Sequence, residues 1–127
     1  MEVIRINLRG AHDRVAQESR ILATLRRKRL LNELHLFRGF RREHLENLMR
    51  DGLDHDPRYA TFASTKEQLL SEFAKEQGEN ALTYALDGGC MAVYTKDVLE
   101  TDGVGGCGYL ANTNIKHGLA AVLVLTP

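Results

Sequence analysis

The chain of 127 residues has the length of one ordinary domain, and its 43% apolar and 27% charged residues are typical of a globular protein and exclude bulk disorder. Its 17 Lys and Arg balance 17 Asp and Glu, which excludes a polybasic nucleic-acid-binding protein by composition. Residues 1–50 carry twelve basic and six acidic residues (+6), and residues 51–127 carry five and eleven (−6). This asymmetry has two interpretations. The two halves pack against each other or simply face the solvent, or a basic segment binds an anionic partner.

Membrane-spanning and secreted proteins are not expected either. The longest apolar run, residues 119–125, is much shorter than the roughly 20 residues of a membrane-spanning helix. The first residues contain no long apolar stretch, so no signal peptide is predicted. Two cysteines, Cys90 and Cys107, do not form a disulfide framework. We therefore expect a cytoplasmic, reduced protein that does not bind a membrane.

The N-terminal third is predicted to hold a strand and a helical segment. Alternating apolar residues from Ile4 to Leu8 predict a short strand, which Gly10 ends. From Ala11 to Leu34, apolar spacings of three, four and seven predict one helix or two in succession. Four consecutive basic residues in this segment are either a solvated helix face or a site for the phosphates of an anionic partner: Arg26, Arg27, Lys28 and Arg29.

The middle of the chain alternates between strands and helices. Residues 34–38 read as a strand that ends at Gly39, and a helix from Arg42 to Asp51 follows with Gly52 as its C-terminal cap. After a polar loop over residues 54–60, residues 61–63 are predicted to be extended. Ser64 or Thr65 then caps a helix that runs to about Glu76, with Glu67 and Gln68 in its first turn.

The last third is predicted to contain the most buried strand. Residues 80–86 form a short helix ended by two glycines, residues 91–94 a strand, and residues 101–108 a glycine-rich turn. Residues 119–125 are apolar throughout, which predicts a central strand buried on both faces. The irregular intervals between strands favour an α+β fold over a doubly wound sheet. We expect one domain over residues 1–127, in which an N-terminal segment, residues 1–33, packs on a small mixed sheet flanked by helices, residues 34–127.

Two apparent motifs are rejected. Residues 103–108 spell G-x-G-x-x-G, but no acidic residue follows within the 19 remaining residues, so a flexible hairpin or loop is favoured over a dinucleotide-binding turn. No pair of histidines or cysteines has metal-ligand spacing, and Asp54-His55-Asp56 is interpreted as a solvated loop rather than a ligand set. No metal is therefore expected.

Arg38 is the most informative single residue. A guanidinium is suited to a bidentate grip on carboxylate or phosphate, and here it follows a predicted buried strand. If this strand and residues 61–63 are neighbours, Arg38 and Ser64 line one cleft. The alternative is that Arg38 pairs with an acidic residue such as Glu43 or Asp51, and that Ser64 merely caps a helix.

Residues 34–95 resemble the front half of the ADP-ribosyltransferase fold. That family has a strand ending in Arg-Gly or His-Gly, a helix closing with Gly-Leu, and a short strand with an aromatic residue and a Ser-Thr motif. Here these are Leu36–Gly39, the helix ending at Gly52-Leu53, and Thr61–Thr65. Residues 80–85 and 92–94 are similar to the helix and strand that usually follow, and residues 119–125 to a late strand.

The resemblance implies that the chain binds NAD as a substrate. Arg38, followed by Gly39, would hold the phosphates and ribose, and Ser64 would hold the ribose beside the nicotinamide, with Thr65 as its neighbour in the motif. From residue type, Phe62 or Tyr84 supplies an aromatic face for the nucleotide.

This chain lacks an acidic residue at the position where the family carries its catalytic carboxylate. The family carries a glutamate at the start of a late strand, whereas residues 103–127 contain no Asp or Glu, and Glu100 is the last glutamate. The chain is therefore either an NAD-dependent transferase of ADP-ribose that brings in Glu100, or a member that does not transfer. The alternative from another class is a non-enzymatic binding or regulatory module that meets an anionic partner or self-associates through its N-terminal helix.

Overall fold

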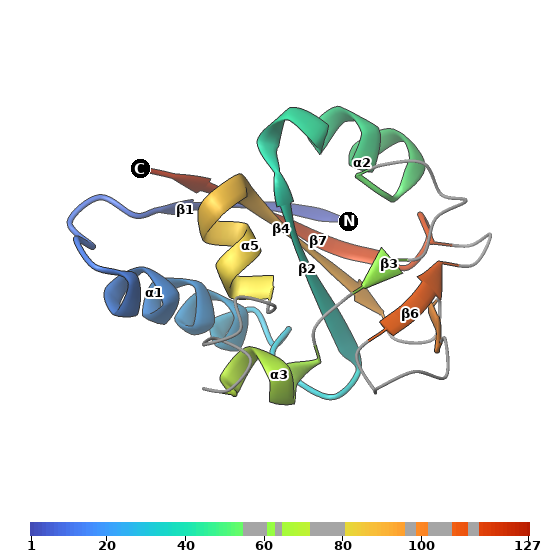
Figure 1. Ribbon diagram of the computed structural model, residues 1–127, viewed down its shortest axis with the longest axis horizontal. Helices are drawn as coiled ribbons and strands as arrows, with labels where there is room; N and C mark the ends of the chain where they lie inside the picture. The colour runs from blue at the N-terminus through green and yellow to red at the C-terminus, as the bar shows by residue number, and fades with distance from the viewer. Residues whose placement is uncertain (55–60, 63–64, 72–80, 96–98, 102–107, 112–114) are drawn as a thin grey trace.

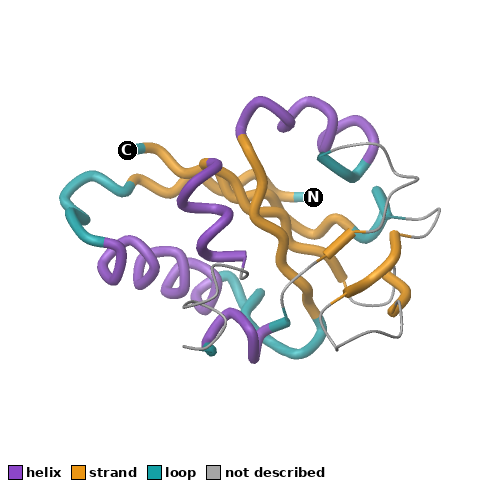
Figure 2. The backbone as a smooth tube through the Cα atoms, in the orientation of Figure 1, coloured by secondary structure: helices purple, strands orange, loops and turns teal. Residues whose placement is uncertain are grey.

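Two sheets organise the protein, as seen in a computed structural model that describes residues 1–54, 61–62, 65–71, 81–95, 99–101, 108–111 and 115–127. A four-stranded mixed sheet has helices on both faces, and a three-stranded sheet lies beside it (Figures 1 and 2). The expected α+β class is therefore confirmed. Within the described residues, no helix is long and apolar enough to cross a membrane.

The main sheet has the strand order β1-β7-β4-β2. Its strands are β1 (Glu2–Asn7), β7 (Leu119–Thr126), β4 (Gly89–Thr95) and β2 (His35–Arg41). β1 pairs parallel with β7, and β4 is antiparallel to both β7 and β2, so β1, β7 and β2 all run in one direction. β7 lies between two strands and buries six of its eight residues, which confirms the predicted central strand.

The small sheet has the order β3-β6-β5 and is antiparallel. It consists of β3 (Thr61–Phe62), β6 (Gly108–Ala111) and β5 (Leu99–Thr101). The short strand at residues 61–62 confirms that prediction. β5 and β6 were not predicted as strands, because neither segment is long enough to show a clear alternation of apolar residues. Their antiparallel pairing agrees with the hairpin or loop expected at the glycine-rich segment. Most of the predicted loop over residues 54–60 and of the predicted turn over residues 101–108 lies outside the described residues, but Thr101 and Gly108 belong to strands, so that turn is shorter than predicted.

Three helices cover one face of the main sheet: α1 (Arg14–Arg27), α3 (Lys66–Leu70) and α5 (Ala81–Gly88). The core between them and the sheet is apolar and joins residues from the strands to residues from each helix: Ile4, Ile6, Ile21, Leu25, Phe37, Leu69, Ala81, Leu82, Ala85, Met91, Val93, Ala121, Leu123 and Leu125. We call this side the α5 face.

The other side, the α2 face, carries the helix α2 (Leu45–Asp51), which follows a 3-10 turn over Arg42–His44. Its core comprises Leu36, Phe40, Leu48, Leu53, Cys90, Ala92, Tyr94, Ile115, Leu119, Val122 and Val124. α2 ends at Gly52 as predicted: its φ of 87° is left-handed, and its N–H donates to the Leu48 carbonyl at 2.8 Å.

The predicted helix over residues 11–34 is wrong in its extent, because α1 ends at Arg27. Lys28 caps it, with its N–H donating to the carbonyls of Thr24 and Arg26. Arg29 adopts a left-handed φ of 59°, which turns the chain out of the helix. The basic run is thus not a helix face. It straddles a helix C-terminus, where cations are favoured by the helix dipole.

The strand predicted to end at Arg38 continues through Gly39 to Arg41, so Arg38 lies in its middle. Gly39 does not turn the chain. A Cβ at this position would lie 2.4 Å from the Ala85 backbone nitrogen and 2.5 Å from the Ala81 carbonyl oxygen. Glycine is required here because the backbone of α5 packs directly on β2.

Candidate functional site

Arg38 points to the α2 face of the main sheet. Side chains alternate along a strand, so Arg38 shares its face with Leu36 and Phe40, which both belong to the α2-face core. Its side chain is 16% exposed. A charged group in this position needs a partner, because a buried unpaired charge is costly.

The partner is Asp54, just beyond the end of α2. Nε of Arg38 donates to Oδ1 at 2.7 Å and Nη2 donates to Oδ2 at 3.3 Å, while the Asp54 side chain is 8% exposed. Two parallel hydrogen bonds fix the plane of the guanidinium. The predicted alternative, a pair with Glu43 or Asp51, is therefore right in kind, but the acidic residue is a different one.

Tyr94 anchors the turn that carries Asp54. Its hydroxyl, on β4, donates to the Gly52 carbonyl at 2.9 Å in a buried position. Burial raises the pKa of Tyr94, as does Asp54, while Arg38 acts in the opposite direction. The phenol therefore stays neutral and remains a donor. We call Arg38, Asp54 and Tyr94 the arginine cluster.

Thr65 lies near the start of β2. It caps α3 with a capping box, in which its hydroxyl accepts from the Gln68 N–H and the Gln68 side chain accepts from its N–H, both at 3.3 Å. This confirms the predicted cap. A cavity of about 230 Å³ is lined here by Glu33, His35, Leu36, Thr65, Lys66 and Glu67. Burial lowers the pKa of His35, whose Nδ1 lies 2.8 Å from Oδ1 of Asn32.

Tyr84 lies on the opposite side of the sheet from the Arg38 guanidinium. Its Cβ would touch a Cβ built on Gly39, which faces α5, whereas Arg38 faces α2. Tyr84 is 51% exposed. The structure does not bring Arg38 and Tyr84 together, because adjacent strand residues point in opposite directions.

Phe62 and Glu100 belong to the small sheet. Phe62 on β3 pairs with Gly108, and Glu100 on β5 pairs with Leu110, so the two residues sit on the strands that flank β6. Ser64 lies outside the described residues. The turn before β7, residues 115–118, offers no carboxylate.

The described residues contain no group of three or more His, Cys, Asp or Glu that could hold a metal ion. Cys90 is buried in β4, and burial raises the pKa of its thiol, which disfavours the reactive thiolate.

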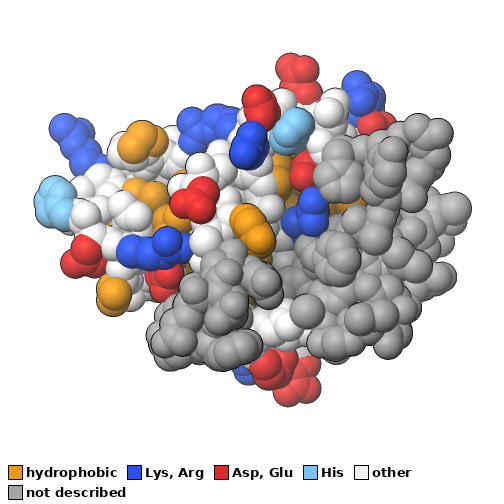
Figure 3. All heavy atoms as spheres, viewed as in Figure 1, with side chains coloured by type: hydrophobic (Ala, Val, Ile, Leu, Met, Phe, Trp, Pro, Cys, Tyr) orange, Lys and Arg blue, Asp and Glu red, His pale blue; other side chains and the backbone are white. Residues whose placement is uncertain are grey.

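The basic run at the end of α1 is exposed in all four residues, Arg26 to Arg29. Lys28 forms an ion pair with Glu2 of β1 at 2.7 Å. On the face shown in Figure 3, basic and acidic side chains are interspersed over the described part of the surface, so the charge asymmetry of the sequence does not form one patch there.

Sequence reasoning missed Asp54 and Tyr94. Asp54 was considered as part of a solvated Asp-His-Asp loop, and Tyr94 as an ordinary strand residue. The signal that could have found Asp54 is its position two residues after the capping glycine of α2, on a turn that returns to the sheet.

No protein-family model, curated protein or solved structure matches this chain. The resemblance of residues 34–95 to the ADP-ribosyltransferase family stays a prediction from short motifs, and the function is argued from the site.

Proposed function

We propose that this chain is an NAD-binding domain of the ADP-ribosyltransferase type, in which Arg38 holds the pyrophosphate. The observation that carries the proposal is the Arg38–Asp54 pair, a guanidinium fixed in one plane by two hydrogen bonds at 2.7 and 3.3 Å. A planar, oriented guanidinium matches the oxygens of a phosphate, and its prior fixation lowers the entropic cost of binding.

The order of elements supports the same proposal. β2 carries Arg38 and Gly39, α2 closes at Gly52, and the short strand β3 follows. α5 and β4 follow later, as the helix and strand of the resemblance do, with α3 between β3 and α5. Gly39 has a structural reason within this arrangement, since it admits α5 onto β2 next to Arg38.

In this proposal, the binding of NAD and the transfer of ADP-ribose depend on different residues. Binding of NAD depends on Arg38, with Ser64 and Thr65 on the ribose beside the nicotinamide. Transfer of ADP-ribose needs a carboxylate to stabilise the positive charge that develops on the ribose as nicotinamide leaves. Glu100 is the candidate, because the turn before β7 has no acidic residue.

A second candidate function, a module that binds an anionic partner, is favoured by the four exposed basic residues at the end of α1. Such binding would weaken steeply with salt, because each phosphate contact releases counterions.

Thermal unfolding with added NAD tests the first proposal. At a concentration 100-fold above its dissociation constant, NAD should stabilise the native chain by about 2.7 kcal/mol. Arg38→Gln should lose this effect, and Arg50→Gln should keep it, because Arg50 forms an exposed pair with Asp51 on the same face. Absence of a shift in the unmodified chain contradicts NAD binding.

Release of nicotinamide separates transfer from binding. If the chain transfers ADP-ribose, Glu100→Gln should abolish nicotinamide release while the thermal shift with NAD remains. Release that persists in Glu100→Gln contradicts the role of Glu100 and leaves the role of Arg38 to the binding experiment.

A further inference from the structure

A second cavity, of about 560 Å³, lies at the end of the main sheet where β1, β7 and β2 finish. Its walls come from the residues that follow these strands and from the facing ends of α1 and α5: Leu8, Arg9, Gly10, Ala11, His12, Gln17, Arg42, Leu86, Asp87, Gly88, Gly89, Leu125 and Pro127. None of these residues belongs to the arginine cluster. The volume falls within the range of about 300–1,000 Å³ typical of small-molecule sites.

The strand directions explain why a cavity forms here. β1, β7 and β2 run in one direction, and from their carboxyl ends β1 continues toward α1 while β2 continues into the 3-10 turn before α2. Ligands of sheets with parallel strands commonly bind outside such carboxyl ends. α5 passes into β4 without a connecting loop, and Gly89, with a left-handed φ of 101°, makes this turn.

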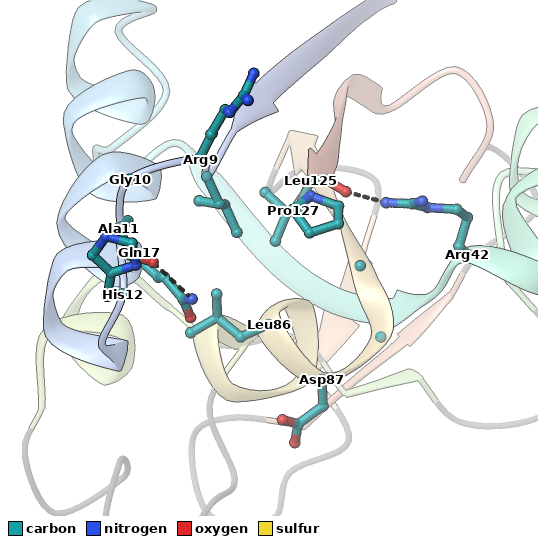
Figure 4. Close-up of a pocket in the computed structure, with 13 residues that line it drawn as sticks. Arg9, Gly10, Ala11, His12, Gln17, Arg42, Leu86, Asp87, Leu125 and Pro127 are labelled. Carbon is teal, nitrogen blue, oxygen red and sulfur yellow. Dashed lines mark hydrogen bonds between the residues drawn. The ribbon is translucent and has the colours of Figure 1, made fainter.

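The inner surface of the cavity is more apolar than polar. Leu86 and Pro127 project into the space between the α1 side and the Arg42 side (Figure 4), and Leu8 and Leu125 also line it. Backbone rather than side chain forms the wall at Gly88 and Gly89. This surface can accommodate a flat apolar body.

Arg42 supplies a fixed positive charge at the edge of this surface. Its Nη2 donates to the Leu125 carbonyl, which holds the guanidinium across the end of β7 (Figure 4). A Cβ on Gly89 would lie 3.4 Å from Nη2 and 3.5 Å from Nε, which is ordinary contact, so the guanidinium lies directly beside this glycine.

The other charged side chains of the wall turn away from this space. The Asp87 carboxylate extends away from the space between Arg42 and Gln17 in Figure 4, and so does the Arg9 guanidinium. His12 and Gln17 form the opposite wall, where Nε2 of Gln17 donates to the Ala11 carbonyl at 3.2 Å. Arg42 is therefore the charged side chain that faces the cavity among its lining residues.

We propose that this cavity binds a small molecule with an apolar body and one ionised carboxylate or phosphate group, with Arg42 as the counter-ion of that group. The site is separate from the Arg38 site, and the proposal does not rest on NAD binding.

The test is a titration of the full, ¹⁵N-labelled chain, in which the NMR chemical shifts of the backbone amides report binding. Benzoate and phenyl phosphate are the anionic ligands, and benzamide is the neutral control. Each anion should shift the amides of Gly10, Gly88 and Gly89, and should bind at least tenfold more tightly than benzamide. The anion with the lower dissociation constant identifies the preferred group, carboxylate or phosphate.

Variants assign the binding to the cavity. Arg42→Gln should weaken the binding of both anions at least tenfold and leave the affinity for benzamide unchanged. Arg41→Gln is the matched control, because Arg41 is exposed and not part of the wall, and it should change nothing. Leu86→Trp, whose larger side chain fills the cavity, should abolish the binding of all three ligands. Equal binding by Arg42→Gln and the unmodified chain, or shifts confined to other amides, overturns the proposal.

Discussion

The two faces of the main sheet are built differently. The α5 face joins strands and helices through apolar side chains and through the close backbone approach at Gly39. The α2 face is also largely apolar, but it includes the ion pair of Arg38 with Asp54 and the hydroxyl of Tyr94. The α5 face also buries polar side chains, but its ion pair, Arg14 with Glu18, joins residues four apart on one helix. The Arg38–Asp54 pair of the α2 face instead joins a strand to a turn sixteen residues away.

The difference is informative because a buried ion pair is a poor source of stability. The desolvation of two charges offsets much of their attraction, and apolar residues of similar volume often stabilise a protein equally well. Stability alone therefore does not account for Arg38 and Asp54, and the binding role that we propose for Arg38 gives them another reason. Changes on each face can test this comparison.

The largest expected effect is that of Asp54→Ala. It leaves the Arg38 charge buried without its carboxylate and should lower the free energy of unfolding by about 3 kcal/mol. The double variant Arg38→Met with Asp54→Leu should restore stability to within about 1 kcal/mol of the unmodified chain. Urea unfolding measures both. A double variant as unstable as Asp54→Ala would show that the pair is needed for folding.

The exposed pair on the same face is the control. Asp51→Ala removes the carboxylate that accepts from Arg50 at 3.0 Å, in a pair whose side chains are both well exposed. Solvent screens such a pair, so the urea midpoint should hardly move.

Gly39→Ala probes the α5 face and should cost about 1–3 kcal/mol, because the added Cβ forces the backbones of β2 and α5 apart. Since the change adds no polar group, binding at Arg38 should be affected less than stability. The free energy of unfolding and the NAD-induced thermal shift measure the two effects. An unchanged stability would contradict the backbone contact.

Tyr94→Phe should cost about 1 kcal/mol, because the buried Gly52 carbonyl loses its donor. Tyr84→Phe, at an exposed tyrosine on α5, should change nothing. Burial raises the pKa of Tyr94, so the native phenol stays protonated while the unfolded one ionises near pH 10. Stability should therefore fall as the pH rises above about 10, and this decline should be smaller in Tyr94→Phe.

The smallest effect concerns His35. Burial lowers its pKa, so the unfolded chain takes up the proton first as the pH falls below 6.5. Stability should decrease between pH 7.5 and 5.5, and His35→Gln should show a weaker decrease than the unmodified chain. Urea unfolding at both pH values measures it, with His12→Gln, on the loop before α1, as the control. Parallel curves for all three proteins would contradict the burial effect.

Much of the fold could be predicted because its signals are local. The apolar run of β7, the glycine cap of α2 and the Thr65 capping box all follow from a few neighbouring residues. The end of α1 and the course of β2 could not be predicted in this way. A basic run is compatible with both the interior and the end of a helix. A glycine after a strand predicts a turn, and only the packing of α5 shows why Gly39 lies within the strand.

The site was predictable in part. Arg38 stands out by its residue type, but its partner comes from a turn sixteen residues later, and only the folded chain brings the two together. Tyr84 was grouped with Arg38 by residue type, although strand alternation places them on opposite faces. The pairing of β5 with β6 is local, joining residues 8 to 12 positions apart around the glycine-rich segment that the sequence predicted to be a hairpin or loop.

The most direct test of the central claim is a calorimetric comparison of NAD with nicotinamide riboside, which lacks the pyrophosphate and the adenosine, in the unmodified chain and in Arg38→Gln. If Arg38 holds the pyrophosphate, the unmodified chain binds NAD more tightly than the riboside. Arg38→Gln should then weaken NAD at least tenfold and leave the riboside unchanged, while Arg50→Gln should change neither. Equal affinities of the unmodified chain and Arg38→Gln for NAD, or no binding of NAD at all, would contradict the account.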